Sequence, residues 1–221
     1  MREFFERDLQ KLKDDILLLG SMVEDAIMES VKVLKKRDFD GSRRVIEADD
    51  RINAKRFAIE DEILRLIATQ QPMASDMRSL AAALEIVTEL ERIGDYAKGI
   101  ANINLMIGEG ALIKPLVDVP RMAEKSCDML HRALDAFVRR DIELARIIPE
   151  EDDEVDDLYN QVYRELIDMI TKTPEVIDQA THLLWVAHNL ERTADRVVNI
   201  CERTVFMVTG AMQEVSATGG H

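Results

Sequence analysis

The sequence predicts an all-α protein made of two tandem three-helix bundles that are related by an internal repeat. First, helix-breaking residues are rare, because the 221 residues include only 9 glycines and 5 prolines, about half of average usage. Second, apolar residues recur at alternating gaps of three and four, which is the period of an amphipathic helix. Third, the two halves of the chain share motifs. Long helices that occur in duplicate account for all three observations.

The first helix is expected to be long and packed in a bundle, because one seam of residues faces a partner helix throughout. Residues 38–42 interrupt this pattern, and we expect Asp40 or Ser42 to cap a second helix that runs to about Thr69. The seam of the first helix consists of Phe5, Leu9, Leu12, Ile16, Leu19, Val23, Ala26, Ser30 and Val33.

A third helix is expected after the connection at residues 70–75 and should end near Gly108 and Gly110. Residues 108–120 hold two glycines and two prolines, the densest group of helix breakers in the chain. The boundary between the halves is therefore expected there, with the first bundle over residues 1–110 and the second over residues 116–208. The seam of the third helix consists of Ala83, Ile86, Leu90, Ile93, Ala97 and Ile100.

The second half is expected to repeat this plan. A fourth helix runs from about Arg121 to Arg139, and Asp141 caps a fifth that reaches Lys172 with a kink or break before Pro149. Thr173 and Pro174 then begin a sixth helix as its cap and first residue. Its apolar residues are Leu183, Val186, Leu190, Val197 and Ile200, and residues 209–221 form a frayed tail.

The repeat itself is visible in two sets of matching motifs. The run LERIGD at residues 90–95 matches LERTAD at residues 190–195, a separation of 100. Arg37-Asp38 matches Arg140-Asp141, and Asp49-Asp50 matches Asp152-Asp153, both at a separation of 103. The second helix therefore corresponds to the fifth and the third to the sixth.

Acidic residues recur at a spacing of four on these matched helices, so each pair projects from one face. Glu91 and Asp95 point well away from the apolar seam of their helix, which places them outside the core. Carboxylates that converge from two neighbouring helices are the oxygen ligands that hard cations prefer, so we interpret these faces as one metal site per repeat. The alternative is that these pairs arise by chance on solvent-exposed faces, because the chain contains 43 acidic residues. The candidate residues are Asp49 and Asn53, Glu91 and Asp95, Asp152 and Asp156, and Glu191 and Asp195 with Asn199.

Charge and composition exclude several other classes of function. A formal net charge of −14 repels nucleic-acid phosphate and anionic lipid, which leaves divalent cations or basic protein surfaces as partners. No catalytic motif is present, and His131, His182 and His188 form no ligand pattern. We expect a soluble cytoplasmic protein without signal peptide or membrane span, with Cys127 and Cys201 as free thiols. Trp185 and the methionines are expected in the core.

The motifs resemble those of the PhoU family, the accessory proteins of phosphate transport that repress the phosphate starvation response. The resemblance rests on residues 71–78 (QPMASDMR), on residues 90–97 (LERIGDYA) and on the echo at residues 190–195, and it covers about residues 4–207. It implies paired three-helix bundles whose E(D)xxxD motifs bind metal at the candidate residues. Asn53 and Gly99 depart from the family pattern, so the second repeat is expected to bind metal more tightly.

The resemblance also implies a function. PhoU proteins are adaptors that connect the ATPase subunit of a phosphate ABC transporter to a membrane sensor histidine kinase when phosphate is plentiful. We therefore expect a non-enzymatic regulator that reaches the membrane only through its protein partners. It is expected to form a homo-oligomer, namely a dimer, and to bind a metal ion of the class Mg²⁺, Mn²⁺, iron or Zn²⁺. The alternatives are a carboxylate-cluster hydrolase or oxidase that depends on metal, and a metal-free helical scaffold.

Overall fold

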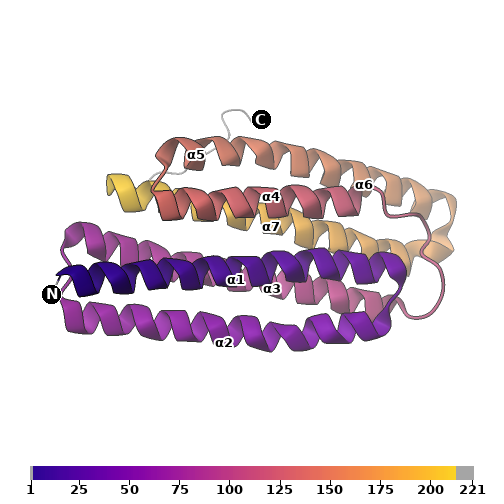
Figure 1. Cartoon of the computed structure of the whole chain (residues 1–221). Coiled ribbons are helices and arrows are strands. Elements are labelled where there is room, and N and C mark those ends of the chain that lie inside the picture. Colours follow the sequence, from indigo (N-terminus) through magenta and orange to yellow (C-terminus); the bar gives the residue numbers. More distant parts are fainter. Residues whose placement is uncertain (1, 213–221) are drawn as a thin grey trace.

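The computed structural model describes residues 2–212, and within that range it contains seven α-helices, two short 3₁₀-helices and no strand (Figure 1). The all-α prediction is therefore confirmed. Helix α7 continues to Thr209, the first residue of the predicted tail. Most of that tail, residues 213–221, lies outside the described residues. The α-helices are α1 (Arg2–Lys36), α2 (Phe39–Gln70), α3 (Ala74–Ile107), α4 (Asp118–Arg139), α5 (Ile142–Ile147), α6 (Asp152–Lys172) and α7 (Ile177–Thr209), and the 3₁₀-helices are η1 (Ile148–Glu151) and η2 (Pro174–Val176).

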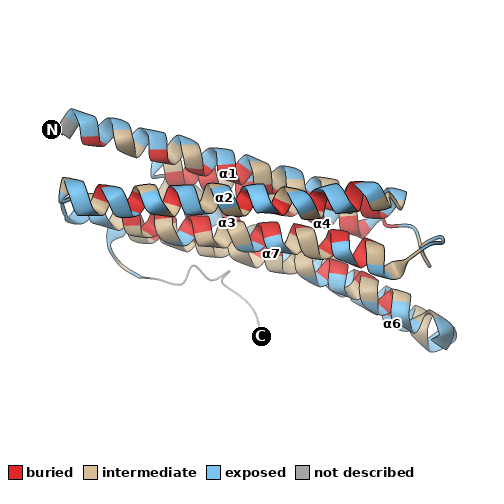
Figure 2. Cartoon of the chain, turned by 90° about the horizontal axis from the view of Figure 1, so that it is seen from below, coloured by how far each residue is buried: buried red, intermediate tan, exposed pale blue. Residues whose placement is uncertain are grey.

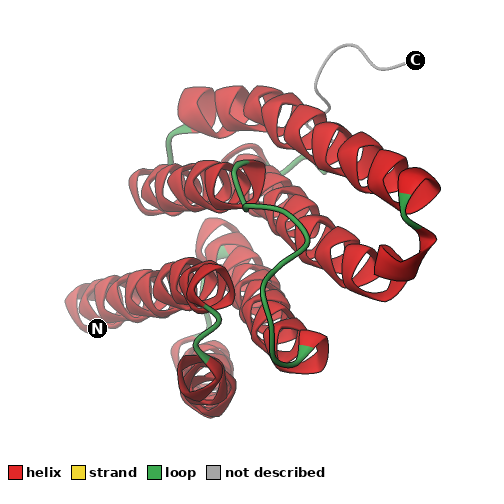
Figure 3. Ribbon diagram, turned by 90° about the vertical axis from the view of Figure 1, so that its right-hand side faces the viewer, coloured by secondary structure: helices red, strands yellow, loops and turns green. Residues whose placement is uncertain are grey.

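The helices form two bundles that lie side by side (Figure 3). Helices α1, α2 and α3 make the first bundle, and α4, α6 and α7 make the second, with the short α5 packed on α4 and α7. The bundles meet where α3 runs along α7 and α1 packs on α4, whereas α2 and α6 flank the outside. Helix α1 begins and α7 ends at the same end of the molecule (Figure 1), where Glu6 and Met207 line one cavity.

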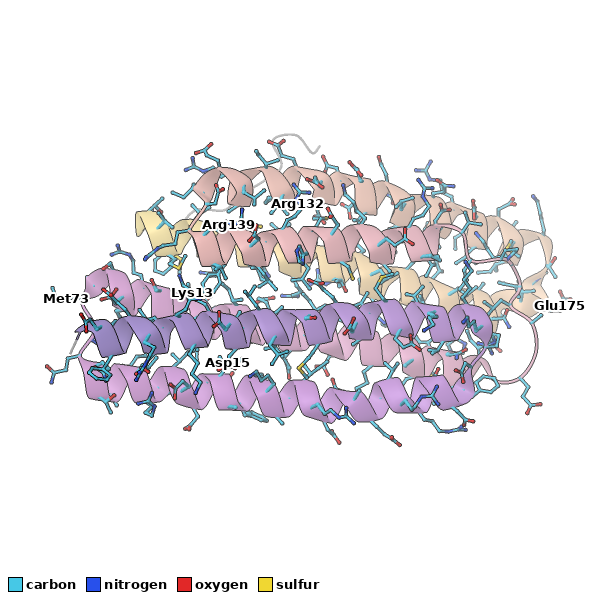
Figure 4. The ribbon with its side chains drawn as sticks, viewed as in Figure 1. Lys13, Asp15, Met73, Arg132, Arg139 and Glu175 are labelled. Atoms are coloured by element: carbon cyan, nitrogen blue, oxygen red, sulfur yellow. The ribbon has the colours of Figure 1, made fainter. Side chains whose placement is uncertain are left out.

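The buried side chains follow the inward stripes of the helices (Figure 2). At the seam between α1 and α4 a methyl group on Gly20 would lie 2.2 Å from Leu134 Cδ1, so the Leu134 side chain would have to shift to admit any larger residue there. A polar contact also joins the bundles, because Lys13 of α1 donates from Nζ to the Val138 carbonyl oxygen of α4 at 3.2 Å (Figure 4). Within the first bundle, Asp15 of α1 pairs with Lys55 of α2.

A half-buried polar contact crosses the interface between α3 and α7. Arg196 of α7 lies with Nη1 3.4 Å from Glu89 Oε2 and with Nε 3.3 Å from the Tyr96 hydroxyl, both on α3. Tyr96 and Arg196 are equivalent positions of the two repeats, a separation of 100. The two long helices thus cross near matching points of the duplicated unit.

Helix starts differ from the predictions in detail. Asp38, not Asp40 or Ser42, caps α2, because its extended backbone lets the carboxylate accept from the Gly41 N–H at 2.8 Å. Asp141 caps α5 as predicted and accepts from the Leu144 N–H at 3.0 Å. The cap position therefore falls two to four residues earlier than the apolar pattern alone suggested in the first repeat.

The proline positions also shape the second bundle. The predicted break before Pro149 is confirmed, because α5 ends at Ile147 and η1 carries the chain into α6. Thr173 and Pro174 take the predicted cap and first positions, but they belong to the one-turn η2 that precedes α7, and the Thr173 side chain makes no capping hydrogen bond. Helix α4 begins three residues before the predicted Arg121, at Asp118.

Two side-chain predictions have opposite outcomes. Cys127 and Cys201 are free thiols, as expected. The prediction that Trp185 belongs to the core is wrong, because its side chain is 58 % exposed, and several methionines, among them Met73 and Met106, also lie exposed.

No helix within residues 2–212 has a stretch of apolar residues long enough to cross a lipid bilayer.

A buried asparagine joins the ends of three helices. Asn104 of α3 donates from Nδ2 to Ser42 Oγ of α2 at 2.8 Å, and its Oδ1 accepts from the Arg37 guanidinium, which follows α1. Arg37 also donates to the Gly108 carbonyl oxygen and has a left-handed backbone with φ 56°. Because Asn104 and Ser42 are removed from water, their polar groups depend on this network for their hydrogen bonds.

We expect Asn104→Ala to lower the free energy of unfolding by about 2–3 kcal/mol, because the Ser42 hydroxyl and the Arg37 guanidinium lose their partner. Urea denaturation measures this change. Asn102→Ala, which removes an exposed amide on the same helix, is the matched control and should stay within about 0.5 kcal/mol of the wild type. Equal losses in both variants would contradict the network.

Candidate metal-binding acidic clusters

Four carboxylates of the second repeat gather between two neighbouring helices. Asp152 and Asp156 come from α6, Glu191 and Asp195 come from α7, and we call them the second-repeat cluster. Burial is the largest cause that raises the pKa of Asp152 to about 7, and the charges of Asp156, Asp195 and Glu191 add to it. The same causes raise the pKa values of Asp156 and Glu191. The cluster therefore concentrates negative charge that the fold does not neutralise.

Two oxygen atoms of this cluster accept no hydrogen bond. Asp152 Oδ1 and Glu191 Oε2 are removed from solvent and make no hydrogen bond. His188 Nδ1 lies 3.2 Å from Glu191 Oε2 without hydrogen-bond geometry, and Arg192 Nη1 pairs with Asp195 Oδ2 at 2.5 Å. A buried oxygen without a donor is costly, so these atoms are open to a cation.

The first repeat places Asp49 and Asn53 of α2 beside Glu91 and Asp95 of α3, and we call these four residues the first-repeat cluster. Asp49 is only 2 % exposed and lies in the core. Asp95 is exposed and Glu91 is half-buried. Asp49 is buried because α3 packs against α2 at this position. The periodicity of α2 alone does not show where α3 lies.

Basic side chains of the same bundle neutralise the first-repeat cluster. Lys98 Nζ donates to Asp49 Oδ2 at 2.7 Å, and Asn53 Nδ2 donates to the same oxygen at 3.0 Å. Arg56 Nη1 donates to Glu91 Oε1 at 3.0 Å. Asp49 Oδ1 alone stays buried without a partner. The first repeat thus supplies its own cations.

The repeat equivalence shows that these cations are missing from the second repeat. Tyr159 stands at the position of Arg56, and Val198 stands at the position of Lys98. Asp156 replaces Asn53, which adds a carboxylate. Two cations are removed and one anion is added, so equal backbones carry clusters of very different charge.

Asn199 lies elsewhere than in the second-repeat cluster. Its Nδ2 is 3.3 Å from Glu89 Oε2 across the interface between α3 and α7. The equivalent position, Gly99, faces Asn189, whose Nδ2 would lie 3.0 Å from a methyl group there. A larger residue than Gly99 would therefore require the Asn189 side chain to move. The structure brings together eight of the nine candidate residues, four in each cluster.

The donor chemistry fits a hard cation, although the side chains are not arranged around one. Within residues 2–212 no three His, Cys, Asp or Glu side chains stand in a geometry that could hold a metal ion. The second-repeat cluster nevertheless offers carboxylate oxygens only, two of them buried and unpartnered, and Mg²⁺ or Mn²⁺ prefers such donors. Coordination would require Asp152, Asp156, Glu191 and Asp195 to turn toward a common centre.

Comparison with known proteins connects this geometry to a family. The family model described as "PhoU domain" matches residues 16–103 and residues 119–204. The chain belongs to the PhoU family. Each match covers one bundle, so the PhoU domain occurs twice, in agreement with the tandem repeat of helical bundles predicted from the sequence.

Relatives and solved structures match the chain over nearly its whole length. The "Phosphate-specific transport system accessory protein PhoU homolog" of Clostridium acetobutylicum is 36 % identical over 219 residues, 97 % of this chain and 99 % of the relative. The PhoU protein of Escherichia coli is 33 % identical and covers 98 % of this chain and 89 % of its own. The crystal structure of PhoU from Pseudomonas aeruginosa has a TM-score of 0.87 at 32 % identity, covering 94 % and 100 %. The PhoU structure from Streptococcus pneumoniae has a TM-score of 0.88 at 31 % identity, covering 95 % and 99 %.

Sequence reasoning missed three residues that shape the clusters of this PhoU protein. Lys98 and Arg56 neutralise the first cluster, and His188 lies against Glu191 in the second. A comparison of repeat positions could have identified the first two, because Arg56 has an aromatic counterpart and Lys98 an apolar one.

Metal-free Asp152→Asn protein is expected to be more stable than the wild type above pH 7. Folding raises the pKa of this carboxyl from 3.8 to about 7. The folded state therefore holds a proton that the unfolded chain has lost between those values, and the stability of the wild type falls as the pH rises through that range. Since the side chain is partly exposed, we expect a gain of about 1–2 kcal/mol at about pH 8.

Urea unfolding in the presence of a chelator, at about pH 5 and about pH 8, measures this effect. Asp153→Asn is the matched control, because it removes the same charge from an exposed neighbour. Identical pH profiles for the two variants would show that burial in the second-repeat cluster does not set the effect.

Proposed function

We propose that this protein is a non-enzymatic adaptor of phosphate homeostasis. It would link the ATPase subunit of a phosphate ABC transporter to a sensor histidine kinase and repress the starvation response when phosphate is plentiful. The support is the match, over nearly the whole chain, to proteins named phosphate-specific transport system accessory proteins. In this proposal the protein is cytoplasmic, forms a homodimer and approaches the membrane through its protein partners.

We also propose that the second-repeat cluster binds a divalent or transition metal ion, of the class Mg²⁺, Mn²⁺, iron or Zn²⁺. The observation that carries this proposal is the set of four carboxylates, of which two buried oxygens accept no hydrogen bond, at positions where Tyr159 and Val198 replace the cations of the first repeat. Asp152, Asp156, Glu191 and Asp195 would hold the ion. In the first-repeat cluster Lys98 and Arg56 compete with any ion, which supports the expectation of weaker binding there.

The metal would supply positive charge that neutralises the acidic face and thereby allows a partner to cover it. Covering these carboxylates is unfavourable, because each charge loses its hydration. Arg192 offsets Asp195 alone. A partner could therefore cover the second-repeat cluster only after the charge of its carboxylates has been neutralised.

The double variant Glu191→Ala/Asp195→Ala is expected to bind Mn²⁺ at least about tenfold more weakly than the wild type, because it removes two of the four ligands. Titration calorimetry and elemental analysis of purified protein measure this. The matched control is Glu91→Ala/Asp95→Ala, which makes the same changes in the first repeat and should retain most of the binding. Equal losses in both variants would refute the assignment to the second repeat.

In cells, Glu191→Ala/Asp195→Ala should release the phosphate response in phosphate-rich medium while the folded protein accumulates normally. A reporter of starvation genes measures this. A pull-down from the same cells, with and without chelator, should recover the transporter ATPase subunit and the histidine kinase only when metal is retained. Unchanged repression by the variant would sink the metal-dependent adaptor.

A further inference from the structure

A group of aromatic side chains, three exposed and one partly buried, lies beside the second-repeat cluster. It consists of Tyr159 and Tyr163 on α6 with Trp185 and His188 on α7, and we call it the aromatic patch. Trp185 is 58 % exposed and Tyr163 is 46 % exposed. Helix α6 flanks the outside of the molecule, away from the first bundle (Figure 3). The patch therefore faces outward from the second bundle.

The rings form one continuous surface. The ring centroids of Tyr159 and Tyr163 are 6.4 Å apart, those of Tyr159 and His188 are 6.3 Å apart, and those of Trp185 and His188 are 6.2 Å apart, edge to face. His188 in turn lies 3.2 Å from Glu191. The aromatic patch thus joins the acidic cluster without a break.

The fold does not require these aromatic residues. The equivalent positions of the first repeat are Arg56, Glu60, Glu85 and Thr88. There Arg56 pairs with Glu60 at 2.8 Å and with Glu91 at 3.0 Å, so charged groups satisfy one another at the surface. The same backbone is stable with polar side chains at these places, and the aromatic patch is specific to the second repeat.

Exposed aromatic groups are typical of interfaces. Leaving Trp185 and Tyr163 in water forgoes the free energy that their burial would provide, and Trp and Tyr are the residues that most often anchor protein contacts. We propose that the aromatic patch docks an amphipathic helix of a partner protein. The apolar side chains of that helix cover the rings, and its Lys and Arg side chains meet the carboxylates that flank the patch.

Charge selects a basic partner. Asp178 lies seven residues before Trp185, and Glu191 lies three residues after His188, so both carboxylates share the face of α7 that carries the rings. The nearby Arg192 is held by Asp195. The faces of Tyr and Trp rings also attract Lys and Arg side chains. A helix with separate apolar and basic sides satisfies the rings and the carboxylates together.

The same charges disfavour the other occupants. A second copy of this chain would place identical acidic clusters against each other in a two-fold contact, with a formal charge of −14 on each chain. An anionic lipid surface would be repelled in the same way. The partner is therefore a basic segment of another protein.

This inference rests on the proposed adaptor role only in requiring that a protein partner exists. It does not depend on metal, because the aromatic patch is formed by side chains outside the four proposed ligands. Its test uses metal-free protein, so that failure of metal binding and failure of docking are separate results.

The chain contains one tryptophan, so the fluorescence of Trp185 reports directly on the patch. A peptide of about 18 residues, five helical turns, with leucines on one side and lysines on the other, should shift its emission to shorter wavelength in a chelating buffer. A peptide of the same length with glutamates in place of the lysines should produce no shift. Equal shifts with both peptides would refute the charge selection.

Calorimetry with variants tests the location. Trp185→Ser and Tyr163→Ser should each weaken binding of the basic peptide at least about tenfold, a loss typical of an interface anchor. Leu64→Ser removes an exposed apolar side chain from α2 at the position equivalent to Ile167 of α6, and it should leave the affinity unchanged. Because all three side chains are exposed, circular dichroism should show the same helix content.

Two outcomes would overturn the proposal. One is undiminished peptide binding by Trp185→Ser, or a loss of equal size in Leu64→Ser. The other is sedimentation showing that the wild type self-associates and that Trp185→Ser abolishes the association, which would assign the patch to a second copy of this chain.

Discussion

The contact between α3 and α7 is the interaction on which the rest of the structure depends. Both helices are buried around much of their circumference, as expected for helices at the centre of a fold. Each belongs to its own three-helix bundle, and each would expose an apolar face if its bundle stood alone. The two repeats therefore complete one core together, and the flanking helices α2 and α6 are free to carry side chains that the core does not specify.

That freedom explains how one duplicated backbone carries two different surfaces. In the first repeat Lys98 and Arg56 stabilise the buried and half-buried carboxylates of Asp49 and Glu91. In the second repeat the corresponding places are apolar or aromatic, and the carboxylates repel one another instead. The first cluster contributes to the fold, whereas the second cluster keeps carboxylates whose mutual repulsion a proton or an external ligand can relieve.

The sequence predicted the helices and their repeat because both depend on local spacing, which a single chain displays. The break before Pro149 was predictable because the proline ring alone is incompatible with a continuous helix. Burial of Asp49 and exposure of Trp185 were not predictable in this way, since each depends on which helix lies opposite. Lys98 and Arg56 reach the carboxylates of the first-repeat cluster from a neighbouring helix. Only a position-by-position comparison of the two repeats indicates that Lys98 has a special role.

The start of α1 and the end of α7 lie at one end of the molecule, and the connection between the bundles, residues 108–117, passes at the other. A chain opened in that connection and joined between these helix ends would present its two repeats in reverse order with every helix contact intact. Circular permutation of this kind would leave the contacts of the core unchanged. The unlike properties of the two bundles are therefore set by their side chains and not by which bundle is synthesised first.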